Sequence, residues 1–412
     1  MGLNEMPSGE RIHIGFFGRV NAGKSSLVNA VTGQQLALVS ENKGTTTDPV
    51  KKAMELLPLG PVVIIDTAGL DDDSSLGQLR IEKTKEILRQ IHIAVLVVDA
   101  LLGKTDTEQE LIELFKENET PYLLAYNKKD LLSDESFIRQ NETEDEAHLY
   151  VSAKTGENVE YLKEKIGQLV KTAKKEKQLV ADLVYPGNQV VLVIPIDKAA
   201  PKGRLILPQQ QTIRELLDYG CRVVICREAE LKETLEGLTE KPALVVTDSQ
   251  VFEQVSKIVP EDVLLTSFSI LFARYKGNLE KMVEGAEVLG KLQTGDKVLI
   301  SEGCTHHRQC GDIGSQKLPA WIRQYTGNEP EFSFTSGGEF PAVLTPYRLI
   351  IHCGGCMLNE KEMQYRMKAA GAQNIPMTNY GTAIARMKGI LERSLQPFQR
   401  EDNLFILKNK RD

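Results

Sequence analysis

The chain has little of what would assign it to several large protein classes. Its 412 residues include only six cysteines, too few for a disulfide framework, and no apolar run is long enough to cross a bilayer. The opening MGLNEMPSGERIHIGFFGR lacks a signal peptide's apolar segment, so we expect a cytoplasmic protein. In such a reducing compartment, clustered cysteine and histidine favour metal ligation over cross-linking.

The charged residues do not form the pattern of a nucleic-acid-binding protein. The net charge is −7, and no basic block of the kind that binds nucleic acid is present. We therefore expect neither a nucleic-acid partner nor a membrane. A content of 41% hydrophobic and 26% charged residues is that of a globular protein, and 412 residues are too many for one core.

Apolar runs and helical patterns divide the chain into three parts. Residues 1–175 alternate buried strands with helices, as nucleotide-binding α/β domains do. Residues 181–270 repeat the alternation without a chemical motif, and we interpret them as a dimerisation domain whose core includes Cys221 and Cys226. Residues 271–412 carry the third alternation and the candidate metal ligands. The predicted fold class is α/β: a P-loop nucleotide-binding domain followed by two smaller α/β domains.

The P-loop is predicted at residues 18–25, GRVNAGKS, which follow a buried strand and open a helix. Gly18 and Gly23 would let the backbone wrap phosphates, whose charge is met by amide groups and the helix N-terminus. Lys24 is expected to reach the β- and γ-phosphates, and Ser25 to ligate Mg²⁺. The remaining nucleotide contacts predicted in this loop are Asn21, Ala22 and Ser26.

Two further segments are expected to meet the γ-phosphate and its metal ion. DTAG ends a strand, and its Asp66 would hold Mg²⁺ through water while the amide of Gly69 senses the γ-phosphate. The polar loop GTTTD carries Thr45 and Thr46, and Thr46 is the candidate Mg²⁺ ligand when the γ-phosphate is present. The predicted catalytic set is Lys24, Thr46, Asp66 and Gly69.

Guanine recognition is predicted at NKKD, which follows another strand and provides Asn127, Lys128 and Asp130. Asp130 can accept hydrogen bonds from guanine N1–H and the exocyclic amine, a pair of donors that adenine lacks. A second segment, SAK, is expected to back the base: Ser152, Ala153 and Lys154. Together these motifs resemble the translation-factor-like GTPases, which implies GTP and GDP as ligands and GTP hydrolysis as the reaction.

Two positions bear on the rate of hydrolysis. Leu70 follows Gly69, where Ras-type enzymes carry a water-orienting glutamine, so slow intrinsic turnover is expected. Asn21 resembles the asparagine of potassium-activated GTPases of the tRNA-modification and Era-like branch, which implies a K⁺ site. A turn-forming role for Asn21 is the alternative.

Soft ligands gather in the last third of the chain, in CTH and HCGGC. Cys304, Cys353 and Cys356 rank first as ligands, because C-x-x-C brings two thiolates to one metal centre. His306 is the most plausible protein-derived fourth ligand, whereas His352 could bind or could support the site through an N–H group. Weaker candidates are Cys310 and Asp312, and His307 is assigned a structural role. Spacing alone fits a [4Fe–4S] cluster and a structural zinc site equally.

The whole combination resembles the [FeFe]-hydrogenase maturation GTPases over essentially the entire chain. The resemblance rests on the GTPase motifs, on the middle segment PIDKAAPKGRLILPQQQTIRELLD, and on CTHHRQCGDIG and HCGGCMLN. It implies a GTP-binding, a dimerisation and a cluster-binding domain in a homodimer that can form a tetramer. It also implies a scaffold that receives a di-iron H-cluster precursor made with two radical-SAM maturases and delivers it to the apo-[FeFe]-hydrogenase.

The resemblance further implies a [4Fe–4S] cluster on Cys304, Cys353 and Cys356, with His306 and His352 nearby and an exchangeable fourth ligand. No radical-SAM motif C-x-x-x-C-x-x-C occurs, so the chain is not expected to perform radical chemistry itself. Two other functions fit parts of the pattern. One is an RNA- or ribosome-associated Era-like GTPase with a zinc-stapled domain, which the acidic balance disfavours, and the other is a nucleotide-gated chaperone for single metal ions.

Overall fold

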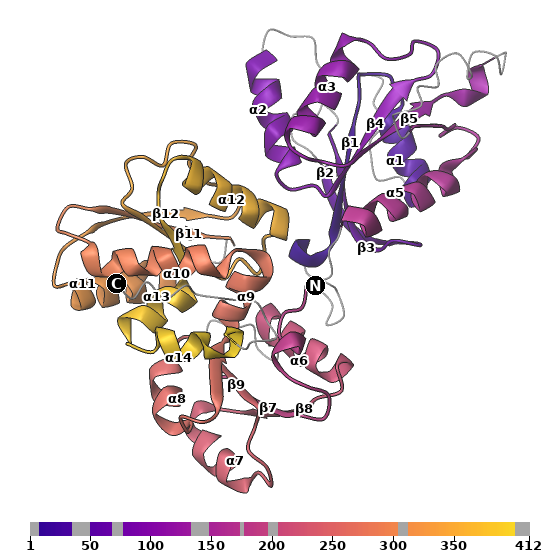
Figure 1. Ribbon diagram of the computed structural model, residues 1–412. Coiled ribbons are helices and arrows are strands. Elements are labelled where there is room, and N and C mark those ends of the chain that lie inside the picture. Colours follow the sequence, from indigo (N-terminus) through magenta and orange to yellow (C-terminus); the bar gives the residue numbers. More distant parts are fainter. Residues whose placement is uncertain are drawn as a thin grey trace. The chain divides into compact units, whose positions relative to one another are not determined.

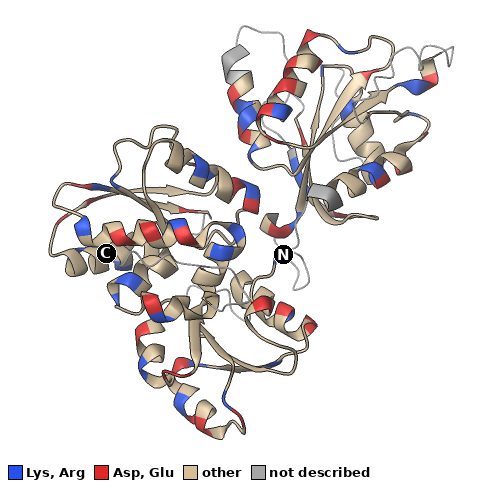
Figure 2. Cartoon of the chain, in the orientation of Figure 1, with Lys and Arg blue, Asp and Glu red and all other residues tan. Residues whose placement is uncertain are grey.

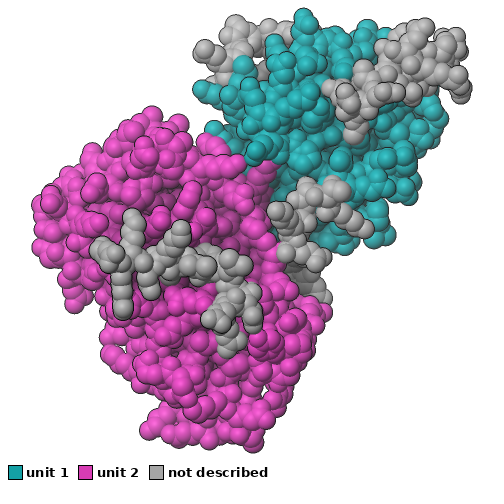
Figure 3. All heavy atoms as spheres, in the orientation of Figure 1, with its two compact units in different colours: residues 1–176 teal, residues 177–412 magenta. Residues whose placement is uncertain are grey.

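The computed structural model describes most of the chain: residues 8–34, 50–67, 77–132, 148–173, 177–196, 205–303 and 312–399. The chain forms two compact units, residues 1–176 (unit 1) and 177–412 (unit 2), which Figure 3 colours separately. Within the described residues, no helix has the length and apolar character needed to span a membrane.

Unit 1 is built on a six-stranded sheet of order β2-β3-β1-β4-β5-β6, in which only β2 is antiparallel to its neighbour (Figure 1). Its strands are β1 (Ile12–Phe17), β2 (Val50–Leu56), β3 (Gly60–Asp66), β4 (Ile93–Asp99), β5 (Tyr122–Asn127) and β6 (His148–Tyr150). Its helices are η1 (Ser8–Glu10), α1 (Lys24–Thr32), α2 (Gly77–Leu88), α3 (Asp106–Glu117), η2 (Lys129–Leu131) and α5 (Val159–Ala173). One hydrophobic cluster joins α1 and α5 to the sheet, and another joins α2 and α3. The central strands are therefore apolar on both faces.

A buried histidine makes the stability of unit 1 depend on pH. His13 in β1 is 7% exposed, its Nδ1 donates to the Arg11 carbonyl, and burial lowers its pKa from 6.5 to about 4. The fold therefore favours neutral His13, and this stabilisation is complete above pH 6.5 and is lost as pH falls through about 4. We expect the loss to reach about 3 kcal/mol of unfolding free energy.

Denaturant unfolding between pH 7 and 4 would measure this dependence. His13→Phe should flatten the curve in that window. Parallel curves for wild type and His13→Phe would contradict the assignment.

Unit 2 contains two four-stranded sheets with parallel pairings throughout, of order β10-β9-β7-β8 and β12-β11-β13-β14. The first consists of β7 (Gln189–Val193), β8 (Arg222–Cys226), β9 (Leu244–Thr247) and β10 (Leu264–Ser267). The second consists of β11 (Lys297–Glu302), β12 (Glu331–Ser336), β13 (Leu349–His352) and β14 (Met377–Asn379). These strands and the helices between them confirm the expected α/β class.

The helices of unit 2 fall into two groups. η3 (Ala181–Leu183) precedes the first sheet, and the helices between its strands are α6 (Leu207–Asp218), η4 (Glu228–Glu230), α7 (Leu231–Gly237) and α8 (Phe252–Ile258). The others are α9 (Phe268–Lys276), α10 (Leu279–Glu287), η5 (Val288–Lys291), the π-helical η6 (Ile313–Lys317), α11 (Leu318–Thr326), α12 (Glu360–Ala372), α13 (Tyr380–Met387), α14 (Leu391–Leu395) and η7 (Gln396–Phe398). One continuous hydrophobic core runs under both sheets, and it includes Cys221 and Cys226 as predicted.

The start of unit 2 is anchored by one carboxylate. Glu215 on α6 accepts hydrogen bonds from the backbone N–H groups of Leu179, Val180 and Ala181 at 2.8–3.0 Å. Bonds from backbone donors to a charged acceptor are stronger than neutral ones. The segment that enters unit 2 is therefore fixed to α6. Figure 2 shows acidic and basic residues interspersed along the helices of both units.

Candidate functional site

The phosphate loop of unit 1 takes a conformation that only small residues allow. Gly18 has φ 142° and Gly23 has φ 85°, and a Cβ at Gly23 would lie 2.2 Å from Nδ2 of Asn127. Gly23 supplies no capping side chain to α1, so the first-turn amides of this helix face the loop as anion donors. The Nζ of Lys24 is buried and donates to the Gly18 carbonyl at 3.1 Å, which holds the ammonium against the loop.

The predicted magnesium ligands of the described residues meet at the start of α1. Ser25 Oγ donates to Asp66 Oδ2 at 3.2 Å, which joins the loop to the carboxyl end of β3. Asp66 is only 3% exposed, and the next residue, Thr67, donates from Oγ1 to the Phe16 carbonyl at 2.6 Å. A hydroxyl beside a carboxylate, at the edge where parallel strands end, fits the coordination that Mg²⁺ prefers.

Asn127 connects the phosphate loop to the predicted base-binding segments. Its Nδ2 donates to the carbonyls of Ala22 at 3.1 Å and Gly23 at 3.3 Å, and its Oδ1 accepts from the Ala153 amide at 3.0 Å. Asp130 is exposed and accepts from Ser152 Oγ at 2.7 Å. Asn127 therefore fixes the spacing between the phosphate loop and the segments expected to hold guanine.

Two ion pairs at this site were missed from the sequence. Arg19, inside the phosphate loop, pairs with fully buried Glu108 of α3 at 2.6 Å. Lys128 pairs with Asp99, at the end of β4, also at 2.6 Å. Glu108 also accepts from the backbone N–H of Thr105, which is the capping box of α3. The capping pattern is the sequence signal that could have pointed to Glu108, but it does not indicate that Glu108 pairs with Arg19.

Several predicted residues lie outside the described ranges: Thr45, Thr46, Gly69, Cys304, His306, His307 and Cys310. Asn21 and Lys154 are described and exposed, and Ser26 is half-buried on α1. Asn21 has φ 66°, which asparagine tolerates better than most residues, so the structure gives this position a backbone role in any case.

The strands that lead to the two cysteine segments of unit 2 are neighbours in one sheet. β11 and β13 are adjacent, with Ser301 opposite His352, and Cys353 lies directly beyond β13. The amide of Gly303, the residue that precedes Cys304, donates to Cys353 Sγ at 3.1 Å. Gly355 adds a second amide to the same sulfur at 3.4 Å. Amide donors around a sulfur favour a thiolate over a thiol.

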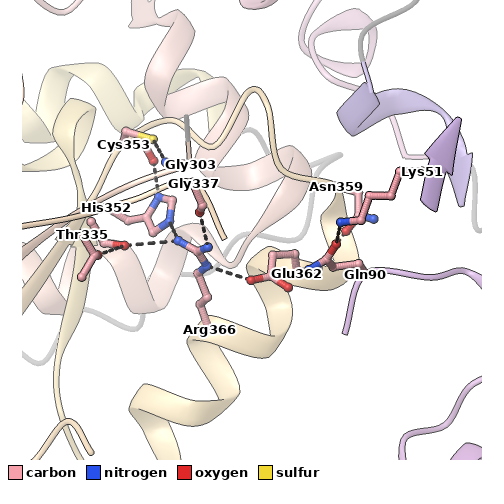
Figure 4. A network of polar contacts seen from close by, with 11 residues as sticks. Lys51, Gln90, Gly303, Thr335, Gly337, His352, Cys353, Asn359, Glu362 and Arg366 are labelled. Carbon is pink, nitrogen blue, oxygen red and sulfur yellow. Dashed lines mark hydrogen bonds and ion pairs between the residues drawn. The ribbon is translucent and has the colours of Figure 1, made fainter. Parts of the chain in front are cut away.

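His352 points into the core rather than toward the sulfur. Its Nδ1 donates to the Cys353 carbonyl at 2.8 Å, and its Nε2 lies 3.0 Å from Nη1 of Arg366 (Figure 4). Burial, together with the Arg366 charge, lowers the pKa of His352 to about 3, so the ring is neutral. Because both nitrogens already have partners, the ring in this position has no lone pair to give a metal.

Arg366 is a fully buried cation beneath the cysteine segment. Besides His352, its guanidinium contacts Glu362 at 3.1 Å, Ser301 Oγ at 3.2 Å and the Gly337 carbonyl at 2.7 Å (Figure 4). The network ties α12 to β11 and to the turn after β12. Nothing in the sequence distinguishes Arg366 from a surface arginine, because its partners come from four separate segments.

Carboxylates also approach the cysteine segment. Tyr380 donates from its hydroxyl to Glu302 Oε1 at 3.0 Å. Burial first, and then the nearby charges of Glu302, Cys353 and Asp312, raise the pKa of Tyr380 well above its usual range. Glu302, Cys353 and Asp312 therefore lie around the Tyr380 hydroxyl. Asp312 is the N-cap of the π-helical turn η6, and its carboxylate accepts hydrogen bonds from the amide and the hydroxyl of Ser315. Glu302 was missed, although it ends β11 two residues before Cys304.

The described residues fit part of a three-thiolate site. Cys353 and Cys356 are half-buried and form no disulfide with the other described cysteines. They lie on a segment at the carboxyl end of parallel strands, and the chain leads to Cys304 from Gly303, whose amide donates to the Cys353 sulfur. Among the described residues, which do not include Cys304, there is no group of three or more His, Cys, Asp or Glu side chains placed to hold a metal ion.

Comparison with protein families assigns unit 2. Residues 179–277 match the model of the Hydrogen maturase F dimerization domain, and residues 280–397 match that of the Hydrogen maturase F tetramerization domain. The chain belongs to the hydrogen maturase F family. Residues 13–128 match the model described as 50S ribosome-binding GTPase, so unit 1 contains a GTPase domain. The family resemblance, and the oligomerising character of unit 2, are thereby confirmed.

Individual relatives match the GTPase domain. The tRNA modification GTPase MnmE of Nitrosomonas europaea is 32% identical over 181 residues, which cover 44% of this chain and 39% of that protein. GTPase Der of Wolinella succinogenes is 33% identical over 174 residues, 40% of this chain and 36% of that one. Among solved structures, Era of Aquifex aeolicus aligns at 18% identity and a TM-score of 0.35, over 52% of this chain and 93% of its own. The chain thus spans well under half the length of the curated relatives it matches.

Proposed function

We propose that this family member is a GTP-hydrolysing scaffold that carries a [4Fe–4S] cluster and transfers a di-iron precursor to an apo-[FeFe]-hydrogenase. One observation carries the proposal: a GTPase domain with a preorganised phosphate loop shares a chain with hydrogen maturase F domains, one of which contains Cys353 and Cys356 at a sheet edge. Three parts follow from the earlier expectations: a GTP-binding domain at 1–175, a dimerisation domain at 181–270 and a cluster domain at 271–412.

In unit 1, Lys24 and the first-turn amides of α1 would bind the β- and γ-phosphates of GTP. Ser25 and Asp66 would hold Mg²⁺ together with Thr46, and Gly69 would sense the γ-phosphate. Asp130 would select guanine, with Ser152 holding its carboxylate in place. GTP binding would order the loop that carries Thr46 and so bias contacts with partner proteins, without acting on iron directly.

In unit 2, Cys304, Cys353 and Cys356 would hold the cluster, whose remaining iron would bind an exchangeable ligand through which cargo can enter and leave. His306 stays the candidate fourth protein ligand. The carboxylate of Glu302 is a further candidate, because Glu302 ends β11, the strand that leads to Cys304. We assign His352 the supporting role, since both its nitrogens have partners. The cargo would come from two radical-SAM maturases.

Anaerobic reconstitution tests the cluster assignment. We expect about four iron and four sulfide per chain, as a [4Fe–4S] cluster requires. Cys353→Ser and Cys356→Ser should lose the brown colour, whereas Cys221→Ser, in the core of the first sheet, should retain it. A colourless wild-type protein with one zinc and no sulfide would overturn the carrier function. It would support the alternative that the GTPase model's description suggests, a ribosome-associated GTPase with a structural zinc.

Co-expression tests the transfer. Apo-hydrogenase should gain hydrogen evolution only when this chain and both maturases are present. Activity without this chain would refute the carrier role even if the cluster is real.

Potassium should accelerate hydrolysis if the side chain of Asn21 binds the ion. We expect GTP turnover about tenfold or more higher in K⁺ than in Na⁺ at equal ionic strength. Asn21→Gly is the informative variant, because glycine keeps the φ of 66° and removes only the side chain. It should abolish the difference between the two ions. Potassium stimulation that survives in Asn21→Gly would leave Asn21 with the turn-forming role alone.

A further inference from the structure

A buried lysine holds the segment that contains both described cysteine ligands. Lys276, the last residue of α9, is 2% exposed. Its Nζ donates to the carbonyls of Leu358 at 2.9 Å, Cys356 at 3.3 Å and Gly355 at 3.4 Å. It also lies 5.5 Å from the centroid of the Phe272 ring, within cation–π range. One ammonium therefore gathers the carbonyls of a short turn from beneath.

A cation at this depth needs a reason. Removing an ammonium from water is costly unless its hydrogen bonds are replaced, and a methionine of similar volume would fill the space without that cost. The C-terminal end of α9 carries a partial negative charge that favours a cation there, but a surface position would serve that purpose equally. The contacts with the three carbonyls explain the burial, because Lys276 can reach these carbonyls only from inside the fold.

The same turn passes the effect of Lys276 on to the sulfur. Gly355 accepts from Lys276 through its carbonyl, and its amide donates to Cys353 Sγ at 3.4 Å. The Gly355 carbonyl lies in the peptide group that leads to Cys356, and the Gly355 amide lies in the preceding peptide group. Fixing the first group restrains the orientation of the second, whose N–H meets the sulfur. Lys276 also belongs to the dimerization match at 179–277, whereas the turn belongs to the tetramerization match at 280–397. The contact thus joins the two domains of unit 2 at the candidate metal site.

We propose that Lys276 is a positioning residue for the cysteine turn at 353–358, supplied by the preceding domain. It restrains Gly355, whose amide donates to Cys353, and, together with Arg366, offsets the negative charge that thiolates and a bound cluster bring to this edge. The charge effect rests on the proposed function. The effect on the turn belongs to the iron-free chain as well.

Hydrogen–deuterium exchange on the full-length, iron-free protein tests the turn. In Lys276→Met we expect the amides of 353–358 to exchange about tenfold faster than in wild type, with β7 and β11 unaffected. Lys281→Met, on the exposed face of α10, removes the same charge nearby and should change nothing. Unchanged exchange at 353–358 would overturn the proposal. Faster exchange throughout both sheets would also overturn it, because Lys276 would then serve the core rather than the turn.

Reconstituted protein tests the charge. Lys276→Met should lose iron to a chelator severalfold faster than wild type, and its cluster should have a more negative midpoint potential. Lys276→Gln keeps a donor without the charge, so it should recover part of the exchange protection but not the potential. A Met variant with wild-type potential and iron retention would refute the electrostatic part. Wild-type protein that takes up no iron and sulfide would instead refute the carrier function. The exchange experiment on the iron-free protein would still test whether Lys276 positions the cysteine turn.

Discussion

Replacing Lys24 with alanine is expected to lower GTP turnover by about 100-fold or more, because the variant loses the cation that meets charge developing on the γ-phosphate. The side chain is buried and bonded to Gly18 O at 3.1 Å, so its ammonium is already held at the phosphate loop. Steady-state phosphate release at saturating GTP measures the effect. Iron and sulfide should stay at wild-type levels, because the cysteines belong to the other compact unit.

Lys116→Ala provides the matched control. It removes a lysine from the exposed face of α3 in the same unit and should leave turnover unchanged. If Lys24→Ala kept its turnover, the phosphate loop would not be the hydrolytic site. If it lost its iron as well, nucleotide and cluster sites would be inseparable, and GTP could not act as an independent switch.

Replacing Arg366 with methionine is expected to lower the unfolding free energy of unit 2 by about 3–5 kcal/mol. The substitution leaves the buried Glu362 carboxylate without its cation and removes donors to Ser301, His352 and Gly337. For a unit of this size the corresponding drop in Tm is about 10 °C. Calorimetry should show the shift in the transition of unit 2 and not in that of unit 1.

Two further variants separate the causes. Arg214→Met removes an exposed arginine paired with Asp218 on α6, and it should leave the unfolding free energy nearly unchanged because solvent screens the pair. The double variant Arg366→Met with Glu362→Gln should be more stable than Arg366→Met alone, because a neutral glutamine costs less to bury than a carboxylate that has lost its pairing with Arg366. A shift no larger than that of Arg214→Met would show that the network contributes little to stability.

Buried strands and glycine-marked turns were predictable, whereas two polar edge strands were not. β1, the buried strand expected before the phosphate loop, is largely apolar because it is covered on both faces. β2 was missed: it lies at the edge of the unit 1 sheet, and Lys51 and Lys52 point to solvent, so its sequence reads as a loop. β12 is also an edge strand, and its mixed polar residues hid it in the same way.

In the candidate sites, the residues within short motifs were predictable from the sequence, whereas the charged residues that hold these motifs in place were not. Residues that touch phosphate, base or metal belong to short motifs with local spacing, so GRVNAGKS and HCGGC were visible in the sequence. The charges that hold those motifs are contributed from a distance: Glu108 reaches Arg19, Arg366 reaches His352, and Lys276 reaches the cysteine turn. Each is an ordinary charged residue in sequence, and only the folded chain brings it to its partner.

The hydrogen bonds from three backbone amides to Glu215 determine where the chain can be cut into two folded fragments. Because three consecutive peptide groups beginning at Leu179 are fastened to α6, a polypeptide that starts at Lys177 keeps its first turn in place without any help from the GTPase half. Cluster chemistry and nucleotide turnover should therefore be separable into two fragments, each fit for its own assay. Glu215→Ala should make that new terminus fray and become the first site of proteolytic trimming.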